Sequence, residues 1–446
     1  MLPEVTLPGS LAVLLGALRP CFTAPSFRTF CGLAAGLAGQ VRRRTVVGML
    51  LGAGLARIWP HDRAHYFFAR ARWQADELGL AVARLAVLLL VPPGAPLTVA
   101  VDDSLFRRSG RTVHGAGWQY DGSSPSRNKL SFGTCFVAAG IVVHLPFLAR
   151  PVCLPVLARL VLPGPKGAAR SGRRRPAVPG TKTAVAVELV TLLAAAFPGR
   201  PVHVVADAAY HGPALRQLPP AVTWTCRLPA NAVLYALAPP RPGRGRPALK
   251  GRRLGTPAQL AAALAGGRGT VHAYGRSTGT ALAAVTCLWH GCTGTRTVRV
   301  ILAKDGRHPM LALVTTDLHA TAAALVTRYA ARWSIEQAFA DARNVLGAGE
   351  ARTRTPRAVQ RTVPFALLIH TLVIIWYARH GHRPQITAAR RAAQPWYTTK
   401  TGPAFEDMLT ALRRVLITAR ISKGSAAHPT PEQTKAVLAA WHAAAA

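Results

Sequence analysis

The sequence predicts an α/β fold, in which a helical N-terminal region leads into a core of strands and helices around a strand-rich segment. Three observations support this. Residues 1–95 carry apolar side chains at helical spacing. From Leu97, short apolar runs of strand type alternate with a helical segment, which is typical of an α/β core. After Asp207 several segments alternate like antiparallel strands, and helical spacing returns at about Leu318.

The N-terminal region is expected to form helices over Leu11–Leu18, Phe30–Leu37, Thr45–Ile58 and a broken or bent stretch, Ala64–Leu90. A basic patch precedes the third of these helices, whose N-cap is predicted to be Thr45. The patch consists of Arg42, Arg43 and Arg44. Basic side chains beside a helix N-terminus suit DNA phosphates, although a solvated charge run is the plain alternative.

The core is expected to contain strands over 97–102, 132–139, 141–148 and 202–207, with a helix over Thr183–Phe197. Asp102 and Asp103 close the first strand and Asp207 closes the last. The chain has only 17 acidic residues against 55 Lys and Arg, and a net charge of +38. Acids kept at strand ends in such a chain suggest ligands for divalent metal beside a polyanion, whereas strand-end Asp more commonly forms turns or helix caps.

The strand-rich segment is expected over 222–228, 270–274, 281–289 and 297–303, with a further strand over 311–315. A Pro-, Gly- and Arg-rich stretch, 239–253, interrupts it. Arg244 and Arg246 in this stretch resemble the core of a hook that enters the DNA minor groove. The alternative is a loop that contacts phosphates without sequence preference.

A long helix is expected from about Leu318 to Val345, with Thr316 or Asp317 as its cap. One face of this helix would carry four polar side chains within an arc of about 60°. They are Tyr329, Arg332, Glu336 and Arg343. Such a stripe is not a core pattern, and a surface ion pair between Arg332 and Glu336 is the competing interpretation. Further helices are expected over 356–379, 403–420 and 430–445.

The composition of the chain limits the classes of molecule that it is expected to bind. A sequence pI near 11.6 favours nucleic acid. No Gly-rich loop with a following Lys and Ser or Thr is present, so no NTP dependence is predicted. The most apolar run, Val363–Tyr377, is too short for a membrane span and fits a buried helix. Scattered cysteines and the lack of a basic leader with a cleavage motif suggest a cytoplasmic protein, on the nucleoid when bound to DNA.

The spacing Tyr329-x2-Arg332-x3-Glu336-x6-Arg343 resembles the Tyr-Arg-Glu-Lys signature of bacterial insertion-sequence DDE transposases, with Arg for the usual Lys. Asp-Asp-Ser at 102–104 and Val-Ala-Asp-Ala-Ala-Tyr at 205–210 are also similar to that family. The resemblance implies a ribonuclease-H-like core, with the first Asp on the first strand, the second on the fourth strand and the Glu on a later helix. It favours Asp102 over Asp103, because Ser104 follows at the second position.

The resemblance implies that Asp102, Asp207 and Glu336 bind two Mg²⁺ (or Mn²⁺) ions and cut and join DNA by in-line phosphoryl transfer. Tyr329, Arg332 and Arg343 would position the strand. The partners would be double-stranded DNA, as element ends with terminal inverted repeats and as target, in a synaptic homodimer. A catalytically silent DNA-binding descendant and another ribonuclease-H-like endonuclease are the alternatives.

These expectations divide the chain into five segments. A helical DNA-binding domain would cover 1–95, and a basic helical tail would cover 381–446. The catalytic core would have two parts, 96–215 and 311–380. A mainly β insertion, 216–310, would separate them, because 129 positions lie between Asp207 and Glu336, where a direct connection needs only a few residues.

Overall fold

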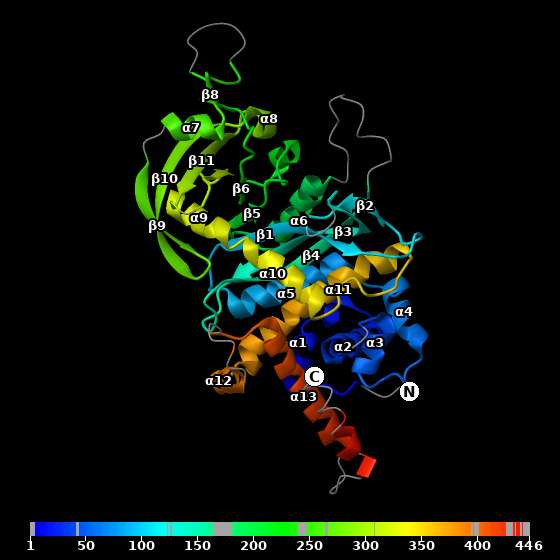
Figure 1. The fold of residues 1–446 in the computed structure, drawn as a ribbon. Helices are drawn as coiled ribbons and strands as arrows, with labels where there is room; N and C mark the ends of the chain where they lie inside the picture. Colours follow the sequence, from blue (N-terminus) through cyan, green and yellow to red (C-terminus); the bar gives the residue numbers. More distant parts are fainter. Residues whose placement is uncertain are drawn as a thin grey trace.

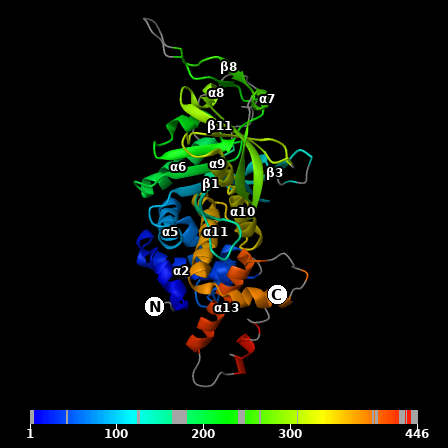
Figure 2. The same cartoon turned by 90° about the vertical axis from the view of Figure 1, so that its left-hand side faces the viewer.

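A computed structural model shows the arrangement of the chain (Figure 1). It describes residues 5–41, 44–122, 124, 127–163, 181–239, 248–263, 266–306, 308–393, 396, 401–424 and 431–439 except 433 and 438. One large sheet crosses the molecule, and helices cover both of its faces (Figures 1 and 2).

The centre of the sheet has five strands in the order β4-β3-β1-β5-β6. Strands β1, β3 and β4 form an antiparallel meander, whereas β5 and β6 run parallel to β1. Helix α6, Lys182–Ala196, connects the two groups and begins at the N-cap Thr181. The strands span β1 Leu97–Arg107, β3 Leu130–Val143, β4 Val152–Val161, β5 Val202–Ala206 and β6 Val222–Arg227. The expected fold class, an α/β mixed sheet with flanking helices, is confirmed.

Two details of this sheet differ from the prediction. The strands expected over 132–139 and 141–148 are one continuous strand, β3, which ends at Val143. Its partner β4 was not predicted, because Pro155 in its middle argues against a central strand. The structure places Pro155 at a bulge, where the register shifts between Ala139 and Gly140, so the proline interrupts the pairing only locally.

The strand-rich segment continues the same sheet beyond β6 in the order β12-β11-β10-β7-β8, with β9 on β10. The prediction that 222–228 belongs with the antiparallel strands is correct on one side only, since β6 pairs in parallel with β5 and antiparallel with β12. Strand β12 then pairs antiparallel with β6 and joins the segment to the core. The elements are β7 Leu234–Tyr235, β8 Arg253–Gly255, α7 Pro257–Ala263, β9 Gly267–Ala273, β10 Arg276–Leu288, α8 His290–Thr293, β11 Thr297–Lys304 and β12 Leu311–Thr315.

The N-terminal region is helical as predicted, and Thr45 caps α3 by accepting a hydrogen bond from the Gly48 amide. Helices α2 and α3 touch closely: a Cβ on Gly36 would lie 1.8 Å from the Met49 carbonyl oxygen. The elements are α1 Gly9–Gly16, η1 Arg19–Cys21, α2 Ala24–Gly39, α3 Val46–Gly52, α4 His61–Ala69 and α5 Ala75–Leu90.

Helix α11, Pro356–Trp376, lies between the N-terminal helices and the sheet (Figure 1). The prediction that this run is too short to span a membrane is wrong, because the continuous helix Pro356–Gly381 is long and apolar enough. The predicted buried helix is confirmed, since 94% of its most apolar window is buried. Arg361 on this helix is buried and donates to carbonyl oxygens of Phe67, Phe68 and Ala71 at 3.0–3.4 Å, and to that of Trp73. These bonds fasten the end of α4 to α11.

The C-terminal part adds η3 Tyr377–Gly381, α12 Pro384–Ala393 and α13 Phe405–Gly424. Helix α13 matches the helix predicted over 403–420, whereas α12 was not predicted. The helix predicted over 430–445 falls largely outside the described residues.

The helix predicted over 318–345 is two helices, α9 Ala322–Ala330 and α10 Trp333–Asn344. Its cap is Thr321, not Thr316 or Asp317. Between the two helices the amides of Ala331 and Arg332 bond three residues back, as in a tight 3₁₀ turn. This break gives Arg332 a position at the start of α10.

Candidate active site

Two aspartates lie side by side where β1 and β5 leave their parallel pairing. The last paired residues are Val101 and Ala206, and Asp102 and Asp207 follow them. Neighbouring strands are about 4.8 Å apart, so the two backbones present these side chains to a common place. Both side chains are partly buried.

Asp102 and Asp103 point to opposite faces of the sheet, because successive strand residues alternate. Asp102 faces α10 and accepts from Arg332, whereas Asp103 faces α6 and pairs with Lys182. Helices α6 and α10 lie on either side of β1 (Figure 2). By the same alternation, Asp207 shares the face of Asp102.

Arg332 joins Asp102 to Glu336. One terminal nitrogen of its guanidinium is 2.9 Å from Asp102 Oδ2, and the other is 2.7 Å from Glu336 Oε1. The side chain of Arg332 is only 12% exposed, so this is not the surface ion pair considered above. Two of the three predicted carboxylates therefore bind the same guanidinium group.

The surroundings of Asp102 disfavour its ionised form. Burial raises the pKa of the Asp102 carboxyl to about 7, although Arg332 and the Asp103 amide act in the opposite direction. Burial would lower the pKa of Arg332, but the charges of Asp102 and Glu336 outweigh it and raise that pKa. The carboxylate thus sits in a place that favours an additional cation.

Tyr329 links this cluster to the third carboxylate. Its ring centroid is 6.0 Å from the Arg332 guanidinium carbon. Burial raises the pKa of Tyr329 to about 12; Arg332 opposes the rise and the nearby charge of Asp207 adds to it. Among the described residues, no side chain donates a hydrogen bond to the Asp207 carboxylate.

Asp103 belongs to a separate network on the other face. Its carboxylate is 2.6 Å from Lys182 Nζ and accepts from the Tyr210 hydroxyl at 2.8 Å. The Cys135 thiol donates to it at 3.3 Å. Sequence reasoning missed Lys182 and Tyr210 as functional neighbours, although Lys182 is the one cation that opens the apolar helix α6 and Tyr210 ends the quoted motif at 205–210.

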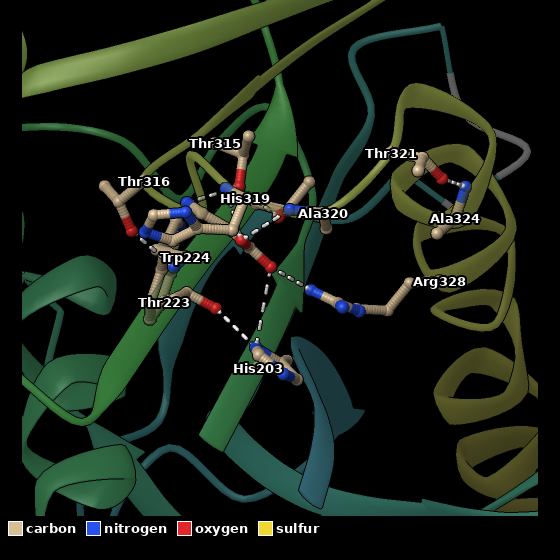
Figure 3. A network of polar contacts seen from close by, with 12 residues as sticks. His203, Thr223, Trp224, Thr315, Thr316, His319, Ala320, Thr321, Ala324 and Arg328 are labelled. Atoms are coloured by element: carbon tan, nitrogen blue, oxygen red, sulfur yellow. Dashed lines mark hydrogen bonds and ion pairs between the residues drawn. The ribbon is translucent and has the colours of Figure 1, made fainter. Parts of the chain in front are cut away.

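A second polar network braces the face that carries Asp207 (Figure 3). Asp317, at the end of β12, accepts from Arg328 Nη1 on α9 at 2.8 Å and from the amides of His319 and Ala320. His203 on β5 lies 3.9 Å from the same carboxylate and bonds Thr223. The network joins β5, β12 and α9, so it fixes the helix that carries Tyr329 against the strand that carries Asp207.

The other predicted site residues lie apart from this cluster. Arg343, at the end of α10, lies near Asp121 and Arg107, and burial is the main reason that its pKa is lowered. Arg44 pairs with Glu350 at 3.5 Å in the loop after α10. Arg42, Arg43, Arg244 and Arg246 lie outside the described residues.

The donor set suits a divalent cation by its chemistry. Within the described residues no group of three or more His, Cys, Asp or Glu side chains is arranged as a metal site. Asp102, Asp207 and Glu336 nevertheless offer only carboxylate oxygens, the ligands that Mg²⁺ and Mn²⁺ accept, and Asp102 is partly buried with a raised pKa. Arg332 lies between two of these ligands and occupies one oxygen of each, Asp102 Oδ2 and Glu336 Oε1, so a metal would bind the remaining oxygens or displace one of the two Arg332 bonds.

Comparisons with known proteins bear on the same region. A family model described as a DDE superfamily endonuclease matches residues 17–295, more than half of the chain. The match includes Asp102 and Asp207 and ends before α10. A search of curated proteins gave no match. Among solved structures, the chain is similar to piggyBac transposase in a cryo-EM synaptic complex with hairpin DNA, at 12% identity and a TM-score of 0.39, over 97% of this chain and 80% of that chain.

Proposed function

Because the chain belongs to the DDE superfamily of endonucleases, we propose that it is a DNA transposase of the branch with the Tyr-Arg-Glu-Lys signature, here ending in Arg343. It would bind terminal inverted repeats, cleave at the element end and join the freed strand to target DNA. The observation that carries the proposal is that Arg332 bridges Asp102, on the first strand, and Glu336, on α10, while the register of β1 with β5 puts Asp207 next to Asp102.

The roles of the residues follow from their places. Asp102, Asp207 and Glu336 would hold two divalent ions. These ions would supply the activation of water or of a 3′-hydroxyl and the stabilisation of the leaving oxygen. Arg332, released from one carboxylate, would turn a nitrogen toward the DNA phosphate, for which its planar fork is suited. Tyr329 would hold Arg332 in place from the α9 side.

The DNA ends would contact the helical N-terminal region, where Arg44 pairs with Glu350 in the loop that follows α10. The high net charge of +38 supports a phosphate-dominated interface with strong salt dependence. We place this activity in the bacterial cytoplasm, in a synaptic homodimer.

A nicking and strand-transfer assay on DNA with element ends and Mg²⁺ tests the proposal. Glu336→Gln should lower the cleavage rate at least about a thousandfold, as expected when an essential ligand is lost. Asp341→Asn, on the same helix but outside the cluster, is the matched control and should stay within a few-fold of wild type. Full activity of Glu336→Gln would overturn the assignment. Cleavage without strand transfer would indicate another endonuclease, and DNA binding without cleavage by the wild type a silent descendant.

A further inference from the structure

A hairpin at the edge of the sheet exposes aromatic side chains that no core packing explains. Strand β2, Gly117–Tyr120, pairs antiparallel with the start of β3. Trp118 is 70% exposed and Tyr120 is 68% exposed. They are paired with Phe132 and Leu130, so four apolar side chains share one face of the hairpin.

This aromatic face lies on the same side of the sheet as Asp102. In the register of β1 with β3, Asp102 is opposite Ala138, and Phe132 lies six residues further along β3 without a register shift. An even number of residues preserves the face, and the separation is roughly 20 Å along the strand. A DNA strand leaving the carboxylate cluster along this face would reach the hairpin.

The surroundings of the hairpin are basic. Arg107, with a side chain that is 60% exposed, borders it, as do exposed Arg111, Arg127 and Lys129. Asp121 is buried and paired with Arg107 at 3.2 Å. Arg343, at the far end of the helix that carries Glu336, lies near this pair. The charge suits a phosphate backbone rather than another copy of this cationic chain.

Hydrogen bonds tie the base of the hairpin to the loop that follows α10. Arg108 donates to the Gly349 and Ala351 carbonyl oxygens at 2.8 and 2.5 Å. The His114 amide donates to the Arg354 carbonyl oxygen at 3.0 Å. The base of the hairpin is thus tied to the loop that follows α10, and its aromatic face keeps a fixed position relative to that helix.

We propose that the hairpin of β2 and β3 binds unpaired DNA bases by stacking them on Trp118 and Tyr120, while the exposed basic side chains around it, such as Arg111, hold the backbone. Exposed aromatic rings within a cationic surface are the usual means of holding a single strand without sequence preference. The site would hold a frayed or released strand near the cutting centre. The inference rests on the proposed function only for the choice of DNA as ligand.

Binding by the full-length chain in EDTA, where no cleavage takes place, tests this site separately from catalysis. Fluorescence anisotropy would compare a duplex carrying a single-stranded tail with a blunt duplex of equal length. Trp118→Ala with Tyr120→Ala should weaken binding of the tailed duplex about tenfold or more and of the blunt duplex much less. Trp118→Phe with Tyr120→Phe should retain most of the affinity.

Controls separate stacking from charge and from folding. Tyr274→Asn, at a 54% exposed aromatic in the turn between β9 and β10, should bind as wild type does, since this turn lies outside the proposed DNA-binding region. Arg111→Gln should weaken the binding of both DNAs and reduce the salt slope by about one, whereas the aromatic variants should leave that slope unchanged. The proposal would be overturned if the double alanine variant bound the tailed duplex with the same affinity as the wild-type protein. An equal loss of affinity for the tailed and the blunt duplex would also overturn it. If the double alanine variant lost a dimer that the wild-type protein forms in sedimentation, the hairpin would instead be a contact between two copies.

Discussion

Replacing Asp102 by Asn should stabilise the protein in EDTA, because the folded state keeps an ionised carboxylate in a poorly hydrated place. Burial raises the pKa of Asp102 from 3.8 to about 7. Each pH unit between the unfolded and folded values corresponds to about 1.4 kcal/mol, so the ionised carboxylate costs about 4 kcal/mol once both states are ionised. The side chain is 18% exposed, so solvent screening reduces this only modestly.

The sign follows from which state holds the proton. Below about pH 4 Asp102 is protonated in both states and costs nothing. Between about pH 4 and 7 the unfolded chain has released the proton that the folded chain keeps, so stability falls as pH rises. We expect Asp102→Asn to exceed wild type by about 4 kcal/mol at pH 8 and by about 1.5 kcal/mol at pH 5.

Urea unfolding followed by tryptophan fluorescence measures both values. Asp103→Asn is the matched control, since it breaks the 2.6 Å pair with Lys182 and should destabilise by about 2 kcal/mol, a figure discounted because the Lys182 side chain is 37% exposed. Added Mg²⁺ should stabilise wild type and much less the Asp102→Asn protein, because a cation that binds only the folded state raises its stability. A variant no more stable than wild type at pH 8, or a difference that does not change with pH, would refute the reasoning.

Three further changes test the framework around the site, each by urea unfolding. Arg361→Met should cost about 3 kcal/mol or more, because several buried carbonyl oxygens lose their donor, and a value under about 1 kcal/mol would contradict this. Burial alone would raise the pKa of Asp317, but Arg328 and two backbone amides hold that pKa below its usual value. Asp317→Asn should therefore be less stable than wild type above about pH 4. The difference in the free energy of unfolding should close as pH falls below that value. Gly36→Ala should destabilise by about 3 kcal/mol or more, since the new methyl meets the Met49 carbonyl oxygen; unchanged stability would mean that α2 and α3 separate freely.

The sequence predicted the α/β class and the main helices because apolar spacing and strand-end acids are local signals. Strand alternation in the sequence could not choose between Asp102 and Asp103, and only the resemblance favoured Asp102, since the helices packed on β1 define its two faces. It missed β4 because the bulge that accommodates Pro155 depends on pairing with β3.

The signature helix shows the same limit. The face drawn on one continuous helix was correct for Arg332 and Glu336, which are four residues apart and in contact. Arg343 keeps the predicted face, since it follows Glu336 by seven residues on the same helix α10, but it lies two turns away, near Arg107 and Asp121. The prediction of one continuous helix was wrong for Tyr329, because α9 ends at Ala330. A local pattern gives the spacing within one turn, whereas the break depends on the sheet beneath.

The position of α11 has a consequence for where DNA would be cut. This helix is buried between the N-terminal helices and the sheet, and Arg361 fastens it to the end of α4. The N-terminal helices therefore have no hinge toward the carboxylates at this contact. If they bind the end sequence as proposed, the folded protein fixes the number of base pairs between the recognised sequence and the phosphate that is cut.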